Sequence, residues 1–162
     1  MKKGSIVDII GAVTLVFFFA ISAILGWVIL DEFGSSTAVT ASGLNTTYID
    51  QAKDATEVWD WGILFILFGS MLFALITAYM VDTHPALFIF GIIVFMIALV
   101  ITMIVSNAFY AFYNTTELAS GAAAFPNLIN VMDHLVEIMI VYGFIMLIVV
   151  YGKLRYNFGG GI

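Results

Sequence analysis

Four long apolar segments dominate this chain and limit what it can fold into. An α-helix needs roughly 20 apolar residues to cross the hydrocarbon core of a bilayer, which is about 30 Å thick. Each of the four segments reaches or exceeds that length, and they cover residues 6–30, 61–81, 86–113 and 128–152. The sequence therefore predicts an all-α integral membrane protein with four transmembrane helices.

The composition leaves no room for a separate soluble domain. Charged residues make up 10% of the chain, whereas a soluble domain carries about 25%. The four spans use up most of the 162 residues, so we expect one domain, residues 1–162. Residues 31–60 are expected to form a polar outer loop, with a flexible stretch at Gly34–Thr37 and a helical lead-in from Thr47 or Tyr48 that continues directly into the second span.

The distribution of charge predicts the topology. Four of the five basic residues lie near the chain ends, namely Lys2, Lys3, Lys153 and Arg155. Four spans place both ends on one side of the membrane, and the positive-inside rule makes that side the cytoplasmic or inner one. The loop after the first span agrees, because it carries Asp31, Glu32, Asp50, Asp54 and Glu57 against Lys53 alone. We therefore expect a multi-pass protein with its N- and C-termini inside.

Aromatic residues at the predicted span borders support the same placement. Tryptophan and tyrosine favour the headgroup level of a bilayer. The predicted outer belt consists of Trp27, Trp59, Trp61, Tyr110 and Tyr113, and the inner belt includes Tyr79 and Tyr151. The alternative is that these rings simply pack between helices.

Small residues spaced four apart predict close helix contacts, because they let transmembrane helices approach one another. Three spans carry such stripes: Ser22 and Gly26; Ser70, Ala74 and Ala78; and Ala98, Thr102 and Ser106. These stripes predict seams inside the bundle or between protomers, and they do not indicate chemistry.

One cluster of ionisable residues is a candidate ion or proton site. Asp133 and Glu137 are four residues apart on one predicted helix face, and His134 lies beside them. An ionisable residue inside a membrane is a functional candidate by default, and histidine titrates near neutral pH. The competing interpretation places all three at the solvated outer border, where acidic groups near a helix N-terminus also suit its dipole.

Cofactors, metals and catalysis are not indicated. The chain has no cysteine, which removes thiolate chemistry and cysteine-bound metal clusters. His84 and His134 fall on opposite predicted faces, so a haem with two histidine ligands is not expected. We find no enzyme signature and expect no bound cofactor. The net charge of −6 argues against nucleic-acid binding, which needs clustered lysine and arginine.

These observations favour a non-enzymatic structural or assembly protein. Such a protein would pack laterally in the bilayer and dock partner proteins, as a subunit of a virion membrane or of a multisubunit membrane complex, and it would form oligomers or hetero-complexes. The alternative is a small oligomeric channel, holin-like pore or proton-linked transporter that uses Asp133, His134 and Glu137. Asn45 and Asn114 each begin an N-glycosylation pattern, which is short and common by chance.

Overall fold

A computed structural model describes residues 6–43, 46–80 and 85–159 of the chain. Within these ranges every regular element is a helix: α1 (Ile6–Ser35), α2 (Thr37–Ser42), α3 (Thr47–Glu57), α4 (Trp59–Met80), α5 (Pro85–Tyr113), α6 (Ala119–Ala122), α7 (Pro126–Asp133) and α8 (Leu135–Gly159). Lys2, Lys3, Asn45 and His84, and the side chain of Arg155, lie outside the described residues.

Four segments are long and apolar enough to cross a membrane, which confirms the predicted fold class at that level. They are Val13–Ser35, Thr47–Met80, Phe88–Tyr113 and Leu135–Leu154. The physical reason is that hydrocarbon offers the backbone no hydrogen-bonding partner, so an apolar segment in lipid must satisfy its own N–H and C=O groups as a helix.

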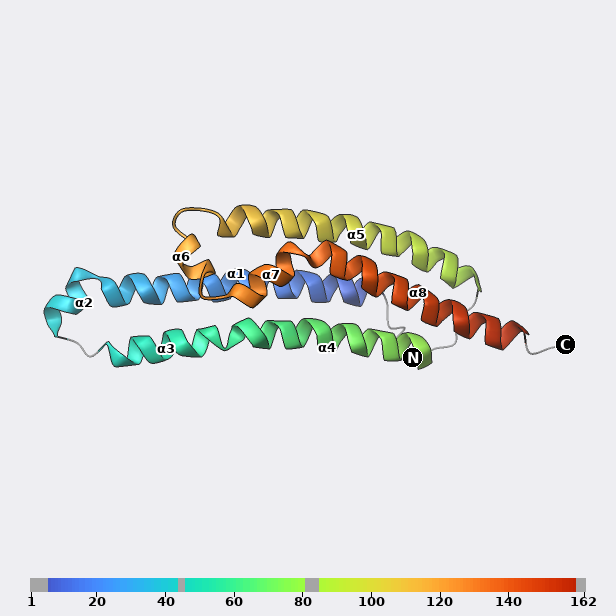
Figure 1. Ribbon diagram of the computed structural model, residues 1–162, viewed down its shortest axis with the longest axis horizontal. Coiled ribbons are helices and arrows are strands. Elements are labelled where there is room, and N and C mark those ends of the chain that lie inside the picture. Colours follow the sequence, from blue (N-terminus) through green and yellow to red (C-terminus); the bar gives the residue numbers. More distant parts are fainter. Residues whose placement is uncertain (1–5, 44–45, 81–84, 160–162) are drawn as a thin grey trace.

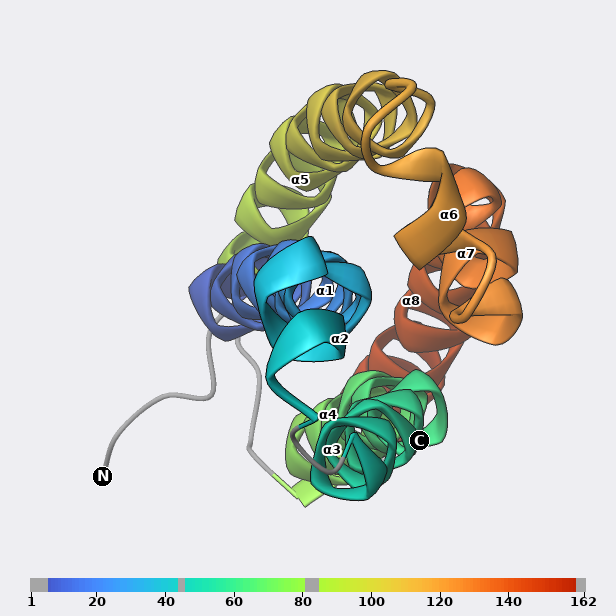
Figure 2. The same cartoon turned by 90° about the vertical axis from the view of Figure 1, so that its left-hand side faces the viewer.

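The four long helices form a ring when the bundle is seen end-on (Figure 2). Contacts join α1 to α4 and α5, and join α8 to the same two helices. We call the end that carries α6 and α7 the loop end, and the end where α4 and α8 finish the tail end (Figure 1). The start of α1 and the end of α8 both lie toward the tail end.

Beyond the loop end, a helical arm projects past α5, α6 and α7 (Figure 1). The arm comprises residues 28–43 and 46–57, which include the last turns of α1 together with α2 and α3. The prediction of a flexible stretch at Gly34–Thr37 is wrong. Gly34 and Ser35 continue α1, while the hydroxyl of Ser36 caps α2 by accepting from the N–H of Val39 at 3.4 Å, as serine commonly does at a helix start.

The predicted lead-in continues into the second span, whereas the fourth segment is interrupted. Helix α3 begins at Thr47, one of the two predicted starts, and Val58 between α3 and α4 keeps helical dihedral angles (φ −58°, ψ −28°), so that Thr47–Met80 counts as one candidate span. The fourth segment is divided into α7 and α8 at His134, which has φ −102° and ψ 15°.

The core is concentrated in the loop half of the bundle. Its largest side chains are 1% exposed or less and include Phe109, Phe125, Leu128, Met132 and Leu135. In the tail half, by contrast, none of the described residues in 72–80, 88–97 and 144–154 is buried. The loop half is therefore a packed globular core, and the tail half presents most of its apolar surface outward.

Candidate functional site

An acidic residue that the sequence analysis did not single out is buried at the loop end. Asp60, in the first turn of α4, is only 5% exposed. Its carboxylate accepts hydrogen bonds from the N–H of Leu128 at 2.7 Å, from the N–H of Asn127 at 3.3 Å and from Nδ2 of Asn127 at 2.7 Å. Asp60 thus joins α4 to the start of α7, a segment 67 residues away in the chain.

The start of α7 has no cap of its own. The first amides of a helix lack intrahelical partners, and the residue preceding α7, Phe125, offers no side-chain cap. Pro126 has no N–H to satisfy, so the amides of Asn127 and Leu128 are the first that need acceptors. The Asp60 carboxylate supplies them, and its negative charge also complements the positive end of the helix dipole.

One sequence signal could have identified Asp60. It stands between two tryptophans, Trp59 and Trp61, at the start of an apolar span. A carboxylate in such a position is costly unless it has partners. Which partners it meets depends on how α4 and α7 are placed in space, so this part of the site is not readable from the sequence.

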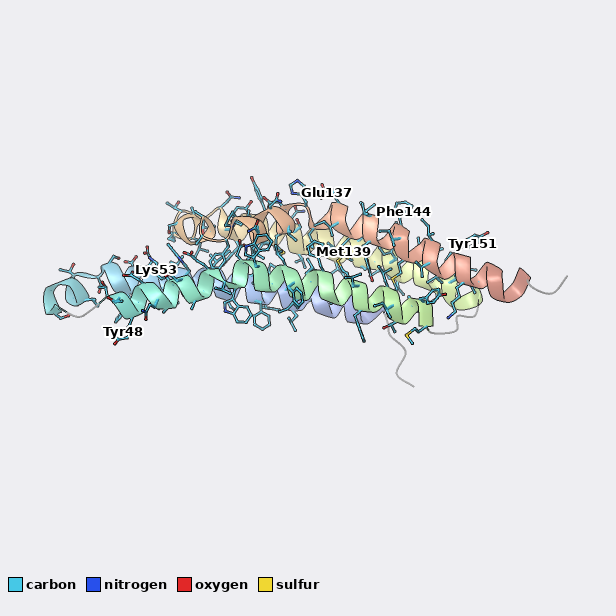
Figure 3. All side chains as sticks on the ribbon, turned by 60° about the horizontal axis from the view of Figure 1, so that its bottom comes forward. Tyr48, Lys53, Glu137, Met139, Phe144 and Tyr151 are labelled. Atoms are coloured by element: carbon cyan, nitrogen blue, oxygen red, sulfur yellow. The ribbon has the colours of Figure 1, made fainter. Side chains whose placement is uncertain are left out.

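The predicted ion site lies on the surface of the loop end. Asp133, His134 and Glu137 are all exposed. Asp133 accepts hydrogen bonds from the Tyr113 hydroxyl at 2.9 and 2.8 Å, and Nδ1 of His134 lies 2.8 Å from the carbonyl oxygen of Asn130. Glu137 points away from the other helices, whereas Met139 points into the bundle (Figure 3).

These three residues do not form one coordinating group. The break at His134 separates Asp133, the last residue of α7, from Glu137 in the first turn of α8. No group of three or more histidine or acidic side chains within the described ranges is placed to hold a metal ion. The arrangement satisfies helix ends and a tyrosine hydroxyl, and it provides no converging set of ligands.

The interior beside this cluster is apolar. Met132, Leu135 and Met139 fill it and are 1% exposed or less. Ser106 donates to the carbonyl oxygen of Met132 at 2.9 Å. The hydroxyl of Tyr142, further along α8, is buried and has no hydrogen-bond partner among the described residues. The described side chains therefore give no continuous polar path along the axis of one chain.

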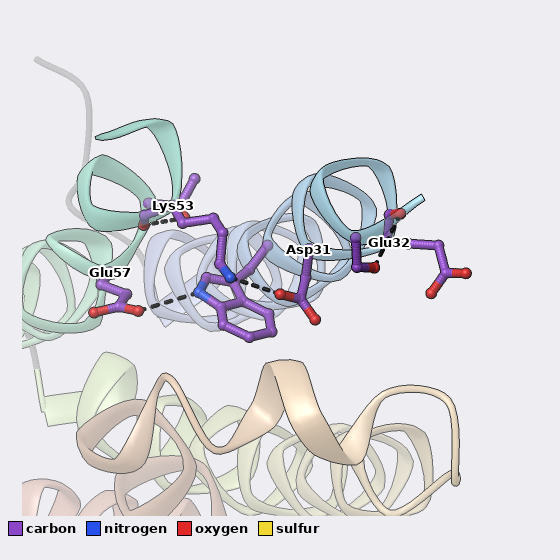
Figure 4. Close-up of polar contacts among 7 residues, drawn as sticks. Asp31, Glu32, Lys53 and Glu57 are labelled. Carbon is purple, nitrogen blue, oxygen red and sulfur yellow. Dashed lines mark hydrogen bonds and ion pairs between the residues drawn. The ribbon is translucent and has the colours of Figure 1, made fainter. Parts of the chain in front are cut away.

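A second polar constellation holds the arm together (Figure 4). Nζ of Lys53 in α3 lies 2.6 Å from Oδ1 of Asp31 in α1, and also 4.5 Å from the centre of the Trp27 ring. Nε1 of Trp27 donates to Glu57 at 3.1 Å. One lysine therefore neutralises an acidic neighbour and covers an aromatic face, which fixes α3 against the end of α1. We call Trp27, Asp31, Lys53 and Glu57 the arm clamp.

The predicted belt residues lie mostly on the surface. Trp59, Trp61 and Tyr110 are exposed at the loop end, and Tyr79 and Tyr151 are exposed at the tail end. Trp27 and Tyr113 are half-buried, because they take part in the polar contacts described above. Trp59 also stacks on Phe19, with 6.2 Å between ring centres. Their place relative to a bilayer remains a prediction.

The three predicted stripes differ in burial. Ala98, Thr102 and Ser106 of α5 are buried, and the stripe of α4 (Ser70, Ala74 and Ala78) is half-buried. Ser22 of α1 is exposed, and a side chain added at Gly26 would have no neighbour within 4 Å. Within one chain, therefore, the α5 stripe lies against neighbouring helices and the α1 stripe faces outward.

The four candidate spans define the class of this chain by length and composition as that of a multi-pass, all-helical membrane protein. No protein-family model, curated protein or solved structure matches it in comparisons with known proteins.

Proposed function

We propose that this protein is a non-enzymatic structural subunit that spans a bilayer, packs laterally and docks partner proteins through its arm. The observation that carries the proposal is the arm. It projects beyond the rest of the bundle (Figure 1). The polar contacts of the arm clamp hold its helix α3 against the end of α1.

The surface of the arm suits contact with proteins. Its exposed side chains combine acidic groups, such as Asp50 and Asp54, with large apolar ones, such as Phe33 and Tyr48. Aromatic residues supply much of the contact area in protein interfaces, and the acidic groups favour a partner with basic residues. Settings that need such a subunit include the membrane of a virion and a multisubunit membrane complex.

The placement of the predicted ion site favours this role over transport. A conducting path needs polar groups facing a lumen, whereas Asp133, His134 and Glu137 lie on the surface and the adjacent interior is apolar. In the proposed role these three residues form part of a solvated acidic rim at the loop end.

The proposal includes a topology in which the tail end is cytoplasmic and the arm faces outward. Because the chain lacks cysteine, single cysteines can report this directly. Thr116→Cys at the loop end should react with a membrane-impermeant maleimide on intact cells, and Gly152→Cys at the tail end should react only after permeabilisation. The reverse labelling pattern would overturn the orientation.

The role itself is tested by extracting the protein from its source membrane in mild detergent and recording native mass spectra. We expect complexes with a defined set of other subunits. The double variant Tyr48→Ser, Asp54→Asn on the arm should lose partners, while Glu117→Gln, an exposed acidic position outside the arm, should keep them. Recovery of the protein alone, or equal retention in both variants, would contradict the proposal.

A further inference from the structure

The outer faces of α5 and α8 differ in where their apolar side chains stop. Residues spaced three or four apart lie on one side of a helix. The α5 face defined in this way is 51–63% exposed and consists of Phe90, Ile93, Ile97, Val100 and Ile104. The α8 face is 59–70% exposed and consists of Val141, Phe144, Ile148 and Tyr151. The next residue of the α5 face toward the loop end is the exposed Asn107, and that of the α8 face is Glu137 (Figure 3).

Contacts between α5 and the α7–α8 segment fix the relative height of the two faces. The hydroxyl of Ser106 donates to the carbonyl oxygen of Met132, and a side chain added at Gly143 would meet the ring of Phe95. The two segments run in opposite directions (Figure 1). Glu137 is five residues after Met132 and six before Gly143, and both counts set it level with about residue 101 of α5, since the rise per residue is the same in both helices.

The α8 face therefore ends in a charge at a height where the α5 face is still apolar. Val100 and Ile104 flank that height and are 58% and 63% exposed. Ionisable residues inside a bilayer face the bundle interior or pair with one another. Glu137 faces outward and makes no hydrogen bond or ion pair with any described residue. Its carboxylate thus marks the height at which α8 leaves the hydrocarbon.

At the tail end the two faces finish together. The rings of Phe88 and Tyr151 lie 6.3 Å apart, and Lys153 follows on α8. From this level to Asn107 the apolar face of α5 measures about 28 Å, and from the same level to Glu137 that of α8 measures about 21 Å, at 1.5 Å per residue. The first length matches a hydrocarbon core of about 30 Å, whereas the second is shorter by about 9 Å.

From these lengths we infer that the α8 face is covered by a locally thinned bilayer and selects phospholipids with short acyl chains. A helix that is shorter than the hydrocarbon core is accommodated when the bilayer thins around it. Short chains cover the α8 face from Val141 to Tyr151 and leave the Glu137 carboxylate in water. The inference rests on the solvated acidic rim in the proposed function and names the kind of lipid beside it.

Two single cysteines at one height test the difference between the faces. His134 is two residues after Met132 and Ile104 is two before Ser106, so the two positions are level, and both are exposed. In dioleoyl-phosphatidylcholine vesicles that hold the purified chain, a water-soluble maleimide should label His134→Cys about tenfold faster than Ile104→Cys or more, because the reactive thiolate forms in water. Equal rates at the two positions would overturn the inference.

A second experiment lengthens the α8 face. Thermal unfolding is compared in vesicles of dioleoyl-phosphatidylcholine and of dierucoyl-phosphatidylcholine, which has longer chains. The midpoint of the unmodified chain should fall in the longer lipid, because the mismatch at α8 increases. Glu137→Leu should remove most of that fall. Glu117→Leu, the same change at an exposed position between α5 and α6, should leave it unchanged. An equal fall in all three proteins would contradict lipid selection by this face.

The outcomes separate this inference from the proposed function. Fast labelling of both cysteines would keep the solvated rim and remove the thinned bilayer. Slow labelling of both would show that lipid or another protein covers this height, which removes the rim together with the inference. Docking through the arm is judged independently, by native spectra of complexes from the source membrane.

Discussion

The loop half and the tail half of this bundle are built from similarly apolar helices but are packed differently. In the loop half, Phe109, Phe125 and Leu128 are fully buried, and a charged group, Asp60, is enclosed with its partners. In the tail half, side chains such as Phe90 and Ile148 are exposed, and no described residue in 72–80, 88–97 or 144–154 is buried. Hydropathy alone does not distinguish the two, because lipid and a protein core are equally apolar environments.

This difference in packing indicates that the loop half contributes most of the stability of the fold. Tight packing yields dispersion contacts that lipid can replace only in part, and a satisfied buried polar group is costly to disturb. We therefore expect substitutions in the loop half to have large effects and equivalent substitutions in the tail half to have small ones.

The largest expected effect is at Phe109. Its ring is fully buried and contacts those of Phe17 and Tyr113, with centres 6.4 and 5.4 Å apart. Phe109→Ala should lower the free energy of unfolding by about 3–5 kcal/mol, measured by titration with sodium dodecyl sulfate. Phe90→Ala on the tail half of the same helix should cost less than about 1 kcal/mol. Similar losses at both positions would remove the contrast between the halves.

Asp60 should come next. Asp60→Ala leaves the amides of Asn127 and Leu128 without acceptors, which should cost about 2–4 kcal/mol. Asp60→Asn keeps one acceptor oxygen and should be milder. Asp54→Ala, an exposed acidic position, serves as the control and should change stability by no more than about 0.5 kcal/mol. A melting temperature unchanged by Asp60→Ala would show that the cap contributes nothing.

Two glycines extend the comparison between the halves. Gly121 lies in α6 at the loop end, and Gly143 of α8 faces Phe95 on the tail half of α5. A side chain at Gly121 would lie 2.3 Å from Val28 and 3.2 Å from the backbone oxygen of Ile24, while one at Gly143 would lie 1.8 Å from the tip of the Phe95 ring. We expect Gly121→Ala to cost about 1–3 kcal/mol and Gly143→Ala to cost less despite the shorter approach. The reason is that the half-buried Phe95 can swing toward lipid, whereas a backbone oxygen cannot move away. A larger loss at Gly143 would show that the region around Phe95 is also rigid.

The smallest expected effect is at the arm clamp. Lys53→Ala removes a partly exposed ion pair with Asp31 and the contact with Trp27, which together should be worth less than about 1 kcal/mol. Thermal unfolding of the bundle should hardly change. Amide hydrogen exchange in α3 should become faster, and this difference should shrink in high salt. Unchanged exchange in α3 would mean that the clamp does not hold the arm.

Several features of the fold could be predicted from the sequence, because they depend on local patterns. The four spans follow from the apolar runs, and α3 begins at Thr47, one of the two starts predicted for it. The exact course of the fourth segment could not be predicted. Its break at His134 follows no proline or glycine there, and α7 is oriented by contacts with distant helices.

The candidate site shows the same limit. The acidic cluster at Asp133 and Glu137 is visible in the sequence, yet its position on the surface depends on how α7 and α8 pack. In the sequence, Asp60 is one more acidic residue near the first loop. Its importance comes from hydrogen bonds to residues that are 67 and 68 positions away.

The sequence by itself determined that the chain forms four apolar helices able to cross a membrane, because an apolar segment in lipid has no other way to satisfy its backbone. Only the tertiary structure decided which polar groups meet, such as Asp60 with α7 and Lys53 with Asp31, and which face of α1 stays uncovered. The physical reason is that hydrogen bonds and close packing act over a few ångströms, so they depend on the rotation and relative height of each helix. Those quantities are set by contacts between segments far apart in the chain.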